Sequence, residues 1–221
     1  KKANQKMSVS EIIKHFYSKP SLIFTYFGIT AVVFVTTSLI TWLPSYFEVT
    51  REITASKAGT LSSSVMGLAI IGAPVGGYLA DRWRNKNLRA RLLFPTLSTI
   101  GAAIFLSLAL FFFKGGIQYV FFLVMGFMLT MFISAAAAVT QDVIHAGLRA
   151  ISYAIAVVIQ NLLGASMAPI IIGKIYDNKG IESAFTVLPF MLIVAAVLFY
   201  LGSRYYEKDI NKVPKVNLEV V

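Results

Sequence analysis

The chain has no cysteine and only two histidines among its 221 residues. Without cysteine it has neither a disulfide framework nor thiolate ligands for a metal. His15 and His145 are far apart, and neither stands in a metal-binding or catalytic motif. The sequence also lacks a phosphate-binding glycine loop and a nucleophile–base pair. We therefore predict no cofactor, no metal site and no enzymatic activity, and the same absences argue against an ATP-driven pump.

Charge is scarce as well. Charged residues make up 14% of the chain against 57% hydrophobic residues, and the mean hydropathy is +0.73. A soluble domain of this composition would leave much apolar surface in water. A helix needs about 20 apolar residues to cross a bilayer, and six stretches with charges only at their ends are long enough. We predict an all-α membrane protein with spanning helices near residues 21–47, 58–80, 91–113, 117–140, 150–174 and 184–204.

The basic residues are divided unevenly between the two sides of these spans. Of the 20 lysines and arginines, all but five fall in the terminal segments and in the second-to-third and fourth-to-fifth connections, which lie on one side. The other five are Arg51, Lys57, Lys114, Lys174 and Lys179. The positive-inside rule makes the richer side cytoplasmic, so both termini are expected there, in a plasma membrane or a bacterial inner membrane. This asymmetry explains the net charge of +10 without a nucleic-acid partner.

Three segments are predicted along the chain. Residues 1–19 are expected to be a cytoplasmic linker with a short amphipathic helix, because Ser8-Val9-Ser10-Glu11 fits a capping box. The alternative is an ordinary start to the first span. Residues 20–206 form the six-helix transmembrane bundle, and residues 207–221 form a polar cytoplasmic tail. Since the chain opens with lysine rather than methionine, we expect a fragment of a longer protein.

Two segments of the chain match each other. Residues 73–81 and 168–177 each contain Ala-Pro followed by Gly-x-x-x-Asp, at the end of a long apolar run. The first copy ends the second span and the second copy ends the fifth span, so Asp81 and Asp177 are expected at opposite membrane faces. Equivalent motifs at opposite faces indicate a 3+3 inverted repeat, with spans one to three mirrored in spans four to six.

The sequence Gly77-Tyr78-Leu79-Ala80-Asp81-Arg82 and the basic cluster after it resemble the major facilitator signature, roughly Gly-x-Leu-x-Asp-Arg-x-Gly-Arg-Lys. Arg84 and Asn85 depart from that signature, whereas Lys86 matches. The resemblance covers residues 7–207 and implies the C-terminal half, helices seven to twelve, of a twelve-helix transporter. Residues 147–150 with 160–164 are similar to the spinster-like branch, and residues 42–46 to the organic-anion symporter branch.

The resemblance implies secondary active transport of a small organic solute by alternating access. An organic anion, a sugar derivative or a lipid-like amphiphile fits, and symport is one mode. Six helices do not enclose a path between two halves, so the partners expected are the missing N-terminal half or a second copy, besides the substrate and the bilayer. No acid or base lies within a span, so in proton-driven transport the titrating group belongs to the other half. The alternative is a non-transporting six-helix receptor or structural module.

The signature region also predicts a conformational latch made of Gly77, Asp81, Arg82 and Arg149. The carboxylate of Asp81 is expected to meet the free N–H groups at the start of the fifth span, where Arg149 adds a charge-assisted bond. This contact would close the cytoplasmic side and favour the outward-open state. The alternative is that Asp81 only ends its helix beside a basic cluster.

Polar side chains on the first and fifth spans are the candidate substrate contacts, because the family lines its cavity with the first, second, fourth and fifth helices of each half. The predicted contacts are Tyr26, Thr30, Thr37, Trp42, Tyr153, Gln160 and Asn161. Amide groups deep in lipid need partners, which are either the substrate or neighbouring helices. For the hydroxyls the alternative is a bond to their own helix.

Overall fold

The computed structural model describes residues 18–213, and the helix predicted within residues 1–19 falls almost entirely outside this range. Every regular element in the range is helical. In chain order the elements are α2 (Pro20–Arg51), α3 (Ala55–Arg84), α4 (Ala90–Ser107), η1 (Leu108–Phe112), α5 (Gly115–Thr130), α6 (Ile133–Asp142), η2 (Ala146–Leu148), α7 (Arg149–Ile159), η3 (Gln160–Ala165), α8 (Met167–Lys179), α9 (Ile181–Phe185) and α10 (Val187–Asn211).

These elements make six helices long and apolar enough to cross a membrane, which confirms the predicted all-α membrane fold. The first two spans are α2 and α3, and the third joins α4 to η1. The fourth is α5 with α6, the fifth runs from η2 through α7 and η3 to α8, and the sixth is α9 with α10. Five of the spans are longer than predicted, and the third, Ala90–Phe112, has the predicted length but begins one residue earlier. The last one continues to Asn211, five residues beyond the expected end of the bundle at residue 206.

Helix is the form that these apolar stretches adopt because a membrane offers no water to unpaired backbone groups. Many hydroxyls inside the spans donate back to a carbonyl one turn earlier, as Thr25 does to Ser21 and Ser38 to Phe34, so they leave no unpaired polar group. Helix α2 also passes through Pro44 and continues to Arg51, although proline lacks a backbone N–H.

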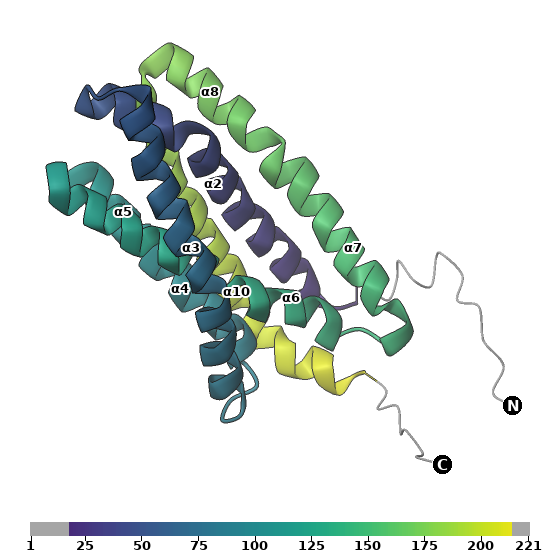
Figure 1. Ribbon diagram of the computed structural model, residues 1–221. Helices are drawn as coiled ribbons and strands as arrows, with labels where there is room; N and C mark the ends of the chain where they lie inside the picture. The colour runs from purple at the N-terminus through teal and green to yellow at the C-terminus, as the bar shows by residue number, and fades with distance from the viewer. Residues whose placement is uncertain (1–17, 214–221) are drawn as a thin grey trace, which may run out of the picture.

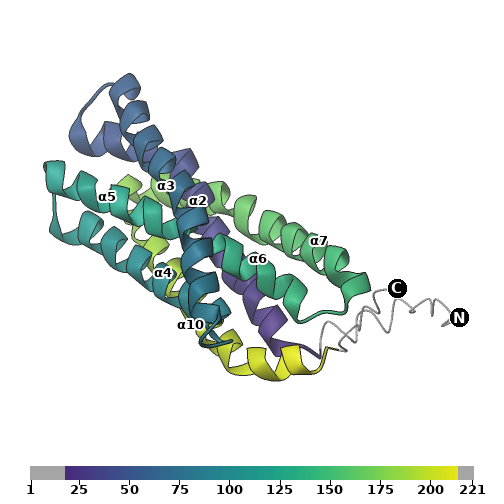
Figure 2. The same cartoon turned by 60° about the horizontal axis from the view of Figure 1, so that its bottom comes forward.

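Helix α2 lies at the centre of the bundle (Figures 1 and 2) and packs against α10 on one side and against η3 and α8 on another. Helix α5 packs in turn against α3 and α4. Span one thus contacts spans five and six, and span four contacts spans two and three. This pairing is unchanged when the first three spans are exchanged for the last three, as any 3+3 repeat requires; the inversion of the repeat stays a prediction.

Glycine residues set the spacing between α3 and the fourth span. A Cβ atom on Gly72 or Gly76 of α3 would collide with the backbone carbonyl of Phe127 or Met131, respectively, in the fourth span. Small residues are therefore required where these two backbones meet.

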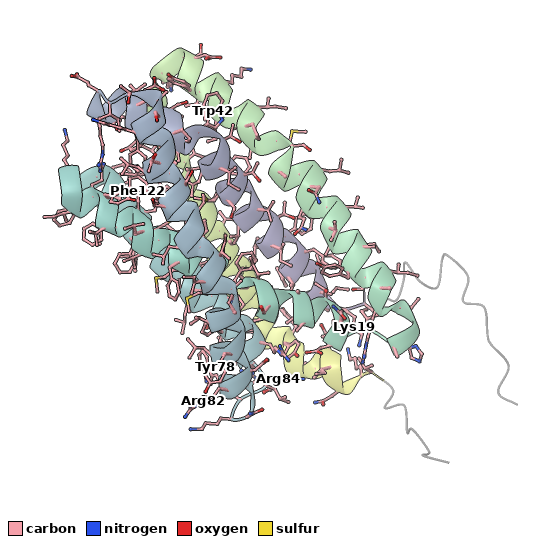
Figure 3. All side chains as sticks on the ribbon, in the orientation of Figure 1. Lys19, Trp42, Tyr78, Arg82, Arg84 and Phe122 are labelled. Carbon is pink, nitrogen blue, oxygen red and sulfur yellow. The ribbon has the colours of Figure 1, made fainter. Side chains whose placement is uncertain are left out.

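A buried aromatic cluster lies at the opposite end of the bundle from Lys19 (Figure 3). Its rings belong to Tyr46, Phe122 and Phe185, and those of Tyr46 and Phe185 are stacked with their centroids 4.5 Å apart.

The start of α2 is tied to the end of α10 by buried polar groups. The carboxylate of Asp209 accepts hydrogen bonds from the backbone N–H and the hydroxyl of Ser21, at 3.0 and 2.6 Å. The Lys19 ammonium donates to the backbone carbonyl of Asp209 at 2.8 Å. An anion at a helix N-terminus is favourable because it meets free N–H groups and the positive end of the helix dipole. Burial lowers the pKa of Lys19 from its ordinary value of 10.5, and Asp209 partly offsets that shift.

Candidate transport site

A cavity of about 250 Å³ lies between spans one, four and five. Its walls are mostly aliphatic and aromatic side chains of α2, α6, α7 and the break between α5 and α6, among them Ile29, Val33, Phe132, Ile133 and Val157. The polar groups of the lining are the side chains of Thr36, Thr37, Thr130, Thr140, Tyr153 and Gln160. No residue that lines this cavity is charged.

Three predicted substrate contacts, Thr37, Tyr153 and Gln160, meet at this cavity. Thr37 and Gln160 lie near the middle of their spans. Among the described residues, none forms a hydrogen bond with the side chains of these three. In contrast, Thr36 donates to Val32 within its own helix. Unpaired hydroxyl and amide groups beside a half-open apolar cavity are available to a ligand.

The cavity lies where two spans depart from regular α-helix. The fourth span breaks between Thr130 and Ile133, both of which line the cavity. The fifth span widens into a π-helical segment that begins at Gln160. Such wide turns are frequent at functional sites, and transporters place binding sites at interrupted helices near the middle of the membrane.

Tyr26 and Thr30 do not line the cavity. Tyr26 is buried, and its hydroxyl lies 2.9 Å from the carbonyl and 2.8 Å from the hydroxyl oxygen of Ser152, so it joins span one to span five. The hydroxyl of Thr30 donates to the carbonyl of Tyr26 at 2.8 Å. Both polar groups are thus satisfied inside the protein: Thr30 makes the bond to its own helix that is the alternative for the hydroxyls, whereas Tyr26 bonds to a neighbouring helix.

Trp42 and Asn161 also lie outside the cavity lining. The indole of Trp42 packs edge-on against Tyr176, with ring centroids 5.6 Å apart, and a Cβ on Gly173 would come within 3.0 Å of it. Trp42 therefore packs α8 against α2. Asn161 is exposed, and its amide donates to the carbonyl of Val157 in its own span at 2.7 Å.

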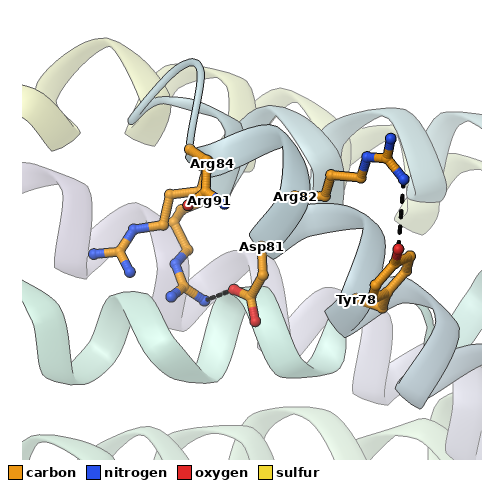
Figure 4. Close-up of a pocket in the computed structure, with 6 residues that line it drawn as sticks. Tyr78, Asp81, Arg82, Arg84 and Arg91 are labelled. Atoms are coloured by element: carbon orange, nitrogen blue, oxygen red, sulfur yellow. Dashed lines mark hydrogen bonds and ion pairs between the residues drawn. The ribbon is translucent and has the colours of Figure 1, made fainter.

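A charged network joins four helices at the basic end of the bundle, which is the end predicted to be cytoplasmic. Arg91 at the start of α4 pairs with Asp81 at 2.9 Å (Figure 4). Arg91 and Arg84 also each lie 3.6 Å from a carboxylate oxygen of Asp142, at the end of α6. The hydroxyl of Tyr206, on α10, donates to the same oxygen at 2.8 Å.

The predicted latch residues are not brought together. Within residues 18–213, no hydrogen bond or ion pair joins Asp81 to Arg149, and α6 lies between the ends of α3 and α7 (Figure 1). Arg82 instead approaches the hydroxyl of Tyr78 at 3.4 Å. Gly77 is a packing position, since a Cβ there would lie 3.0 Å from the hydroxyl oxygen of Ser134.

The family model of the Major Facilitator Superfamily matches residues 1–169, which is more than half of the chain. The chain belongs to the major facilitator superfamily. This major facilitator chain is 30% identical over 208 residues to protein spinster homolog 1 of Bos taurus, and 29% identical to that of Homo sapiens. Each alignment covers 85% of this chain but only 39% of the relative, so the chain spans about two fifths of these curated relatives.

Solved structures show the same fold. A bacterial homolog to the human lysosomal transporter Spinster, in an inward-facing and unoccupied conformation, matches with a TM-score of 0.73 and 16% identity. The match covers 95% of this major facilitator chain and 53% of that protein. A peptide transporter in complex with alafosfalin matches with a TM-score of 0.66 and 20% identity, over 84% of this chain and 38% of that one. Six spans and these shares agree with one half of a transporter. Of the two branches that the sequence left open, the relatives carry the spinster name.

From the sequence we did not identify Asp142 or the cavity-lining residues Thr36, Thr130 and Thr140. A signal for Asp142 existed: it is the one acid at the basic end of the fourth span, opposite the arginine-rich connection. The threonines gave no such signal, because only the packing of spans one and four brings these residues to one cavity.

Proposed function

We propose that this chain is the C-terminal half of a secondary active transporter and moves a small organic solute by alternating access. The observation that carries the proposal is the mid-membrane cavity, where Thr37, Tyr153 and Gln160 present unpaired polar groups beside two interrupted spans. The membrane is proposed to be a plasma membrane or a bacterial inner membrane, with the basic end of the bundle cytoplasmic.

The lining suggests what this half contributes to recognition. Its aliphatic walls suit an apolar part of the solute, and the hydroxyl and amide groups can form hydrogen bonds with polar atoms attached to that part. Because the lining carries no charge, we propose that the ionised group of an organic anion, or of a charged amphiphile or sugar derivative, is bound by the second half. The driving ion is assigned to that half for the same reason.

Two spans are left open to receive the second half. In an apolar stretch of 18 residues, 28% is buried in span two and 22% in span five, less than in the other four spans. We propose that a missing N-terminal half, or a second copy of this chain, packs along these two spans and completes the wall of the cavity.

The latch is proposed in a changed form. Asp81 and Arg149 belong to one half, which tilts as a rigid body, so a contact between them would not change between the inward- and outward-facing states. The side chain of Asp81 is 63% exposed at the end of span two. We propose that its state-dependent partner is a helix N-terminus of the second half, and that Arg149 faces that half from span five.

Uptake by proteoliposomes tests the proposal. The complete transporter containing this chain is assayed with a labelled aromatic carboxylate, a disaccharide and a single-chain amphiphile, each with and without a proton gradient. We expect uptake of at least one probe, reduced about tenfold or more by Gln160→Leu, because a hydrogen bond and a site of matching polarity are lost. Gln141→Leu makes the same change at an exposed glutamine outside the cavity and serves as the control. Equal uptake by both variants would refute the assigned site.

A further inference from the structure

A second pocket, of about 280 Å³, lies at the end of the bundle opposite the basic end, and we call it the outer pocket. Its walls come from span one, the π-helical end of span three, the connection after that span and the start of span six. The lining residues are Tyr46, Leu110, Phe111, Lys114, Glu182, Ser183 and Thr186. None of them also lines the mid-membrane cavity, and the proposed function does not use the outer pocket.

The outer pocket has a buried hydroxyl group in its lining. Tyr46 is only 3% exposed, and its hydroxyl oxygen accepts a hydrogen bond from the amide of Gln118 at 3.2 Å. That amide is held in place, because it also donates to the carbonyl of Ala109 at 2.9 Å and its oxygen accepts from Arg51 at 3.1 Å. The O–H of Tyr46 finds no acceptor among residues 18–213. A buried donor without an acceptor is costly, so a ligand that supplies an acceptor is favoured here.

Two opposite charges stand in the same lining without partners. Lys114 follows the end of span three, and Glu182 lies at the start of span six. In the part of the chain that the structure describes, the side chains of these two residues form no ion pair and no hydrogen bond, and neither does the hydroxyl of Ser183. The pocket thus offers a cationic donor, an anionic acceptor and two hydroxyl groups. A ligand that carries both a negative and a positive group matches this set.

The surroundings indicate the source of such a ligand. The walls of the outer pocket belong to spans one, three and six, and not to spans two and five, which the second half is proposed to cover. Deeper in the membrane, spans three and six pack against each other through α4 and α10, and both expose apolar side chains there. Ile104 of α4 is 53% exposed and Phe190 of α10 is 66% exposed. These side chains suit the acyl chains of a lipid, whereas a water-soluble zwitterion gains nothing from them.

We propose that the outer pocket binds the phosphoethanolamine headgroup of a phospholipid from the leaflet opposite the basic end. Lys114 and the hydroxyl of Tyr46 donate to the phosphate, and Glu182 accepts from the ammonium group. A choline headgroup has no N–H to donate to Glu182. A glycerol headgroup brings a phosphate charge to the pocket without an ammonium group to compensate Glu182. The arrangement of charges therefore predicts that phosphatidylethanolamine binds more tightly than phosphatidylcholine or phosphatidylglycerol.

Native mass spectrometry of the complete protein in neutral detergent tests this proposal. Dihexanoyl phosphatidylethanolamine, phosphatidylcholine and phosphatidylglycerol are titrated in parallel, with free phosphoethanolamine as the water-soluble probe. We expect phosphatidylethanolamine to bind most tightly. Glu182→Gln is expected to weaken its binding about tenfold and not to weaken that of phosphatidylglycerol, because only the ammonium contact is lost. Lys114→Gln removes the phosphate contact, so it is expected to weaken the binding of both lipids.

Matched variants separate this site from a general effect of charge. Glu48→Gln and Lys57→Gln make the same two changes at exposed residues of the same membrane face, outside the outer pocket, and are expected to bind like the wild type. Equal losses in these controls, or unchanged phosphatidylethanolamine binding in Glu182→Gln, would overturn the proposal. Equal affinity of the wild type for the three lipids would do the same, and this comparison does not depend on the folding of any variant. Free phosphoethanolamine binding as tightly as the lipid would overturn the assignment to lipid.

Discussion

Removal of the Asp142 carboxylate is expected to destabilise the basic end of the bundle. Asp142 accepts a hydrogen bond from Tyr206 at 2.8 Å and faces Arg84 and Arg91 at 3.6 Å each. Its side chain is 24% exposed and that of Arg91 only 12%, so the charges are partly shielded from water. In Asp142→Ala both arginines lose an opposing charge, and the Tyr206 hydroxyl loses its acceptor.

The size of the effect follows from these contacts. A hydrogen bond to a charged group contributes about 1.5–3 kcal/mol, and each partly exposed ion pair contributes at most about 1 kcal/mol. We expect Asp142→Ala to lower the free energy of unfolding by about 2–3 kcal/mol. Asp142→Asn keeps an acceptor for Tyr206, so about half of that loss is expected. Per kcal/mol, Tm falls by roughly 2–4 °C for chains of this size.

Thermal unfolding in detergent, followed by the fluorescence of the chain's two tryptophans, measures this ranking. Tyr206→Phe completes a double-mutant cycle, and we expect a coupling of about 1 kcal/mol between Tyr206 and Asp142. Glu207→Ala is the matched control, because Glu207 pairs with Arg89 at 3.2 Å on the more exposed surface and is expected to matter less. An unchanged Tm for Asp142→Ala, or a loss no larger than that of Glu207→Ala, would refute the reasoning.

Two other predictions concern topology and pH. Because the chain has no cysteine, Asp81→Cys and Asp177→Cys each carry a single thiol, and an impermeant maleimide is expected to label them from opposite sides of intact cells; labelling from the same side would contradict the inverted repeat. Burial lowers the pKa of Lys19 below 10.5, so the folded protein releases this proton at a lower pH than the unfolded chain does. Stability is therefore expected to rise as pH increases from the lowered pKa toward 10.5 and then to level off. Urea unfolding at several pH values measures this slope, and Lys19→Met should reduce it; an equal slope in the variant would remove Lys19 as its cause.

The six spans were predictable because charge is excluded from long stretches of the sequence, and that exclusion is a direct consequence of the cost of charge in lipid. The ends were less predictable. The first helix was expected to end near residue 47, but it continues through Glu48 to Arg51, because charged residues at the membrane boundary remain helical. Likewise α10 includes Glu207 and Asp209, since Asp209 is paired with Ser21 at the far end of the chain.

The candidate site was predictable only in part. Helical spacing correctly grouped Tyr153 with Gln160, but the π-helical segment that begins at Gln160 alters the spacing beyond it, and Asn161 falls outside the cavity lining. Tyr26 has the same polar character as Tyr153, yet its hydroxyl is taken by Ser152 from another span. Sequence patterns describe one helix at a time, so they do not show which polar group finds a partner across helices.

The hydrogen bond between Lys19 and Asp209 has a consequence for how such bundles are joined. Since these two residues are in hydrogen-bond contact, the first helix begins and the last helix ends at one point of the same membrane face. A second bundle of six spans that is joined in tandem at this face keeps the same orientation in the membrane. Two such six-span units can be joined in one chain, and each unit can keep its own helix packing while the two share one function.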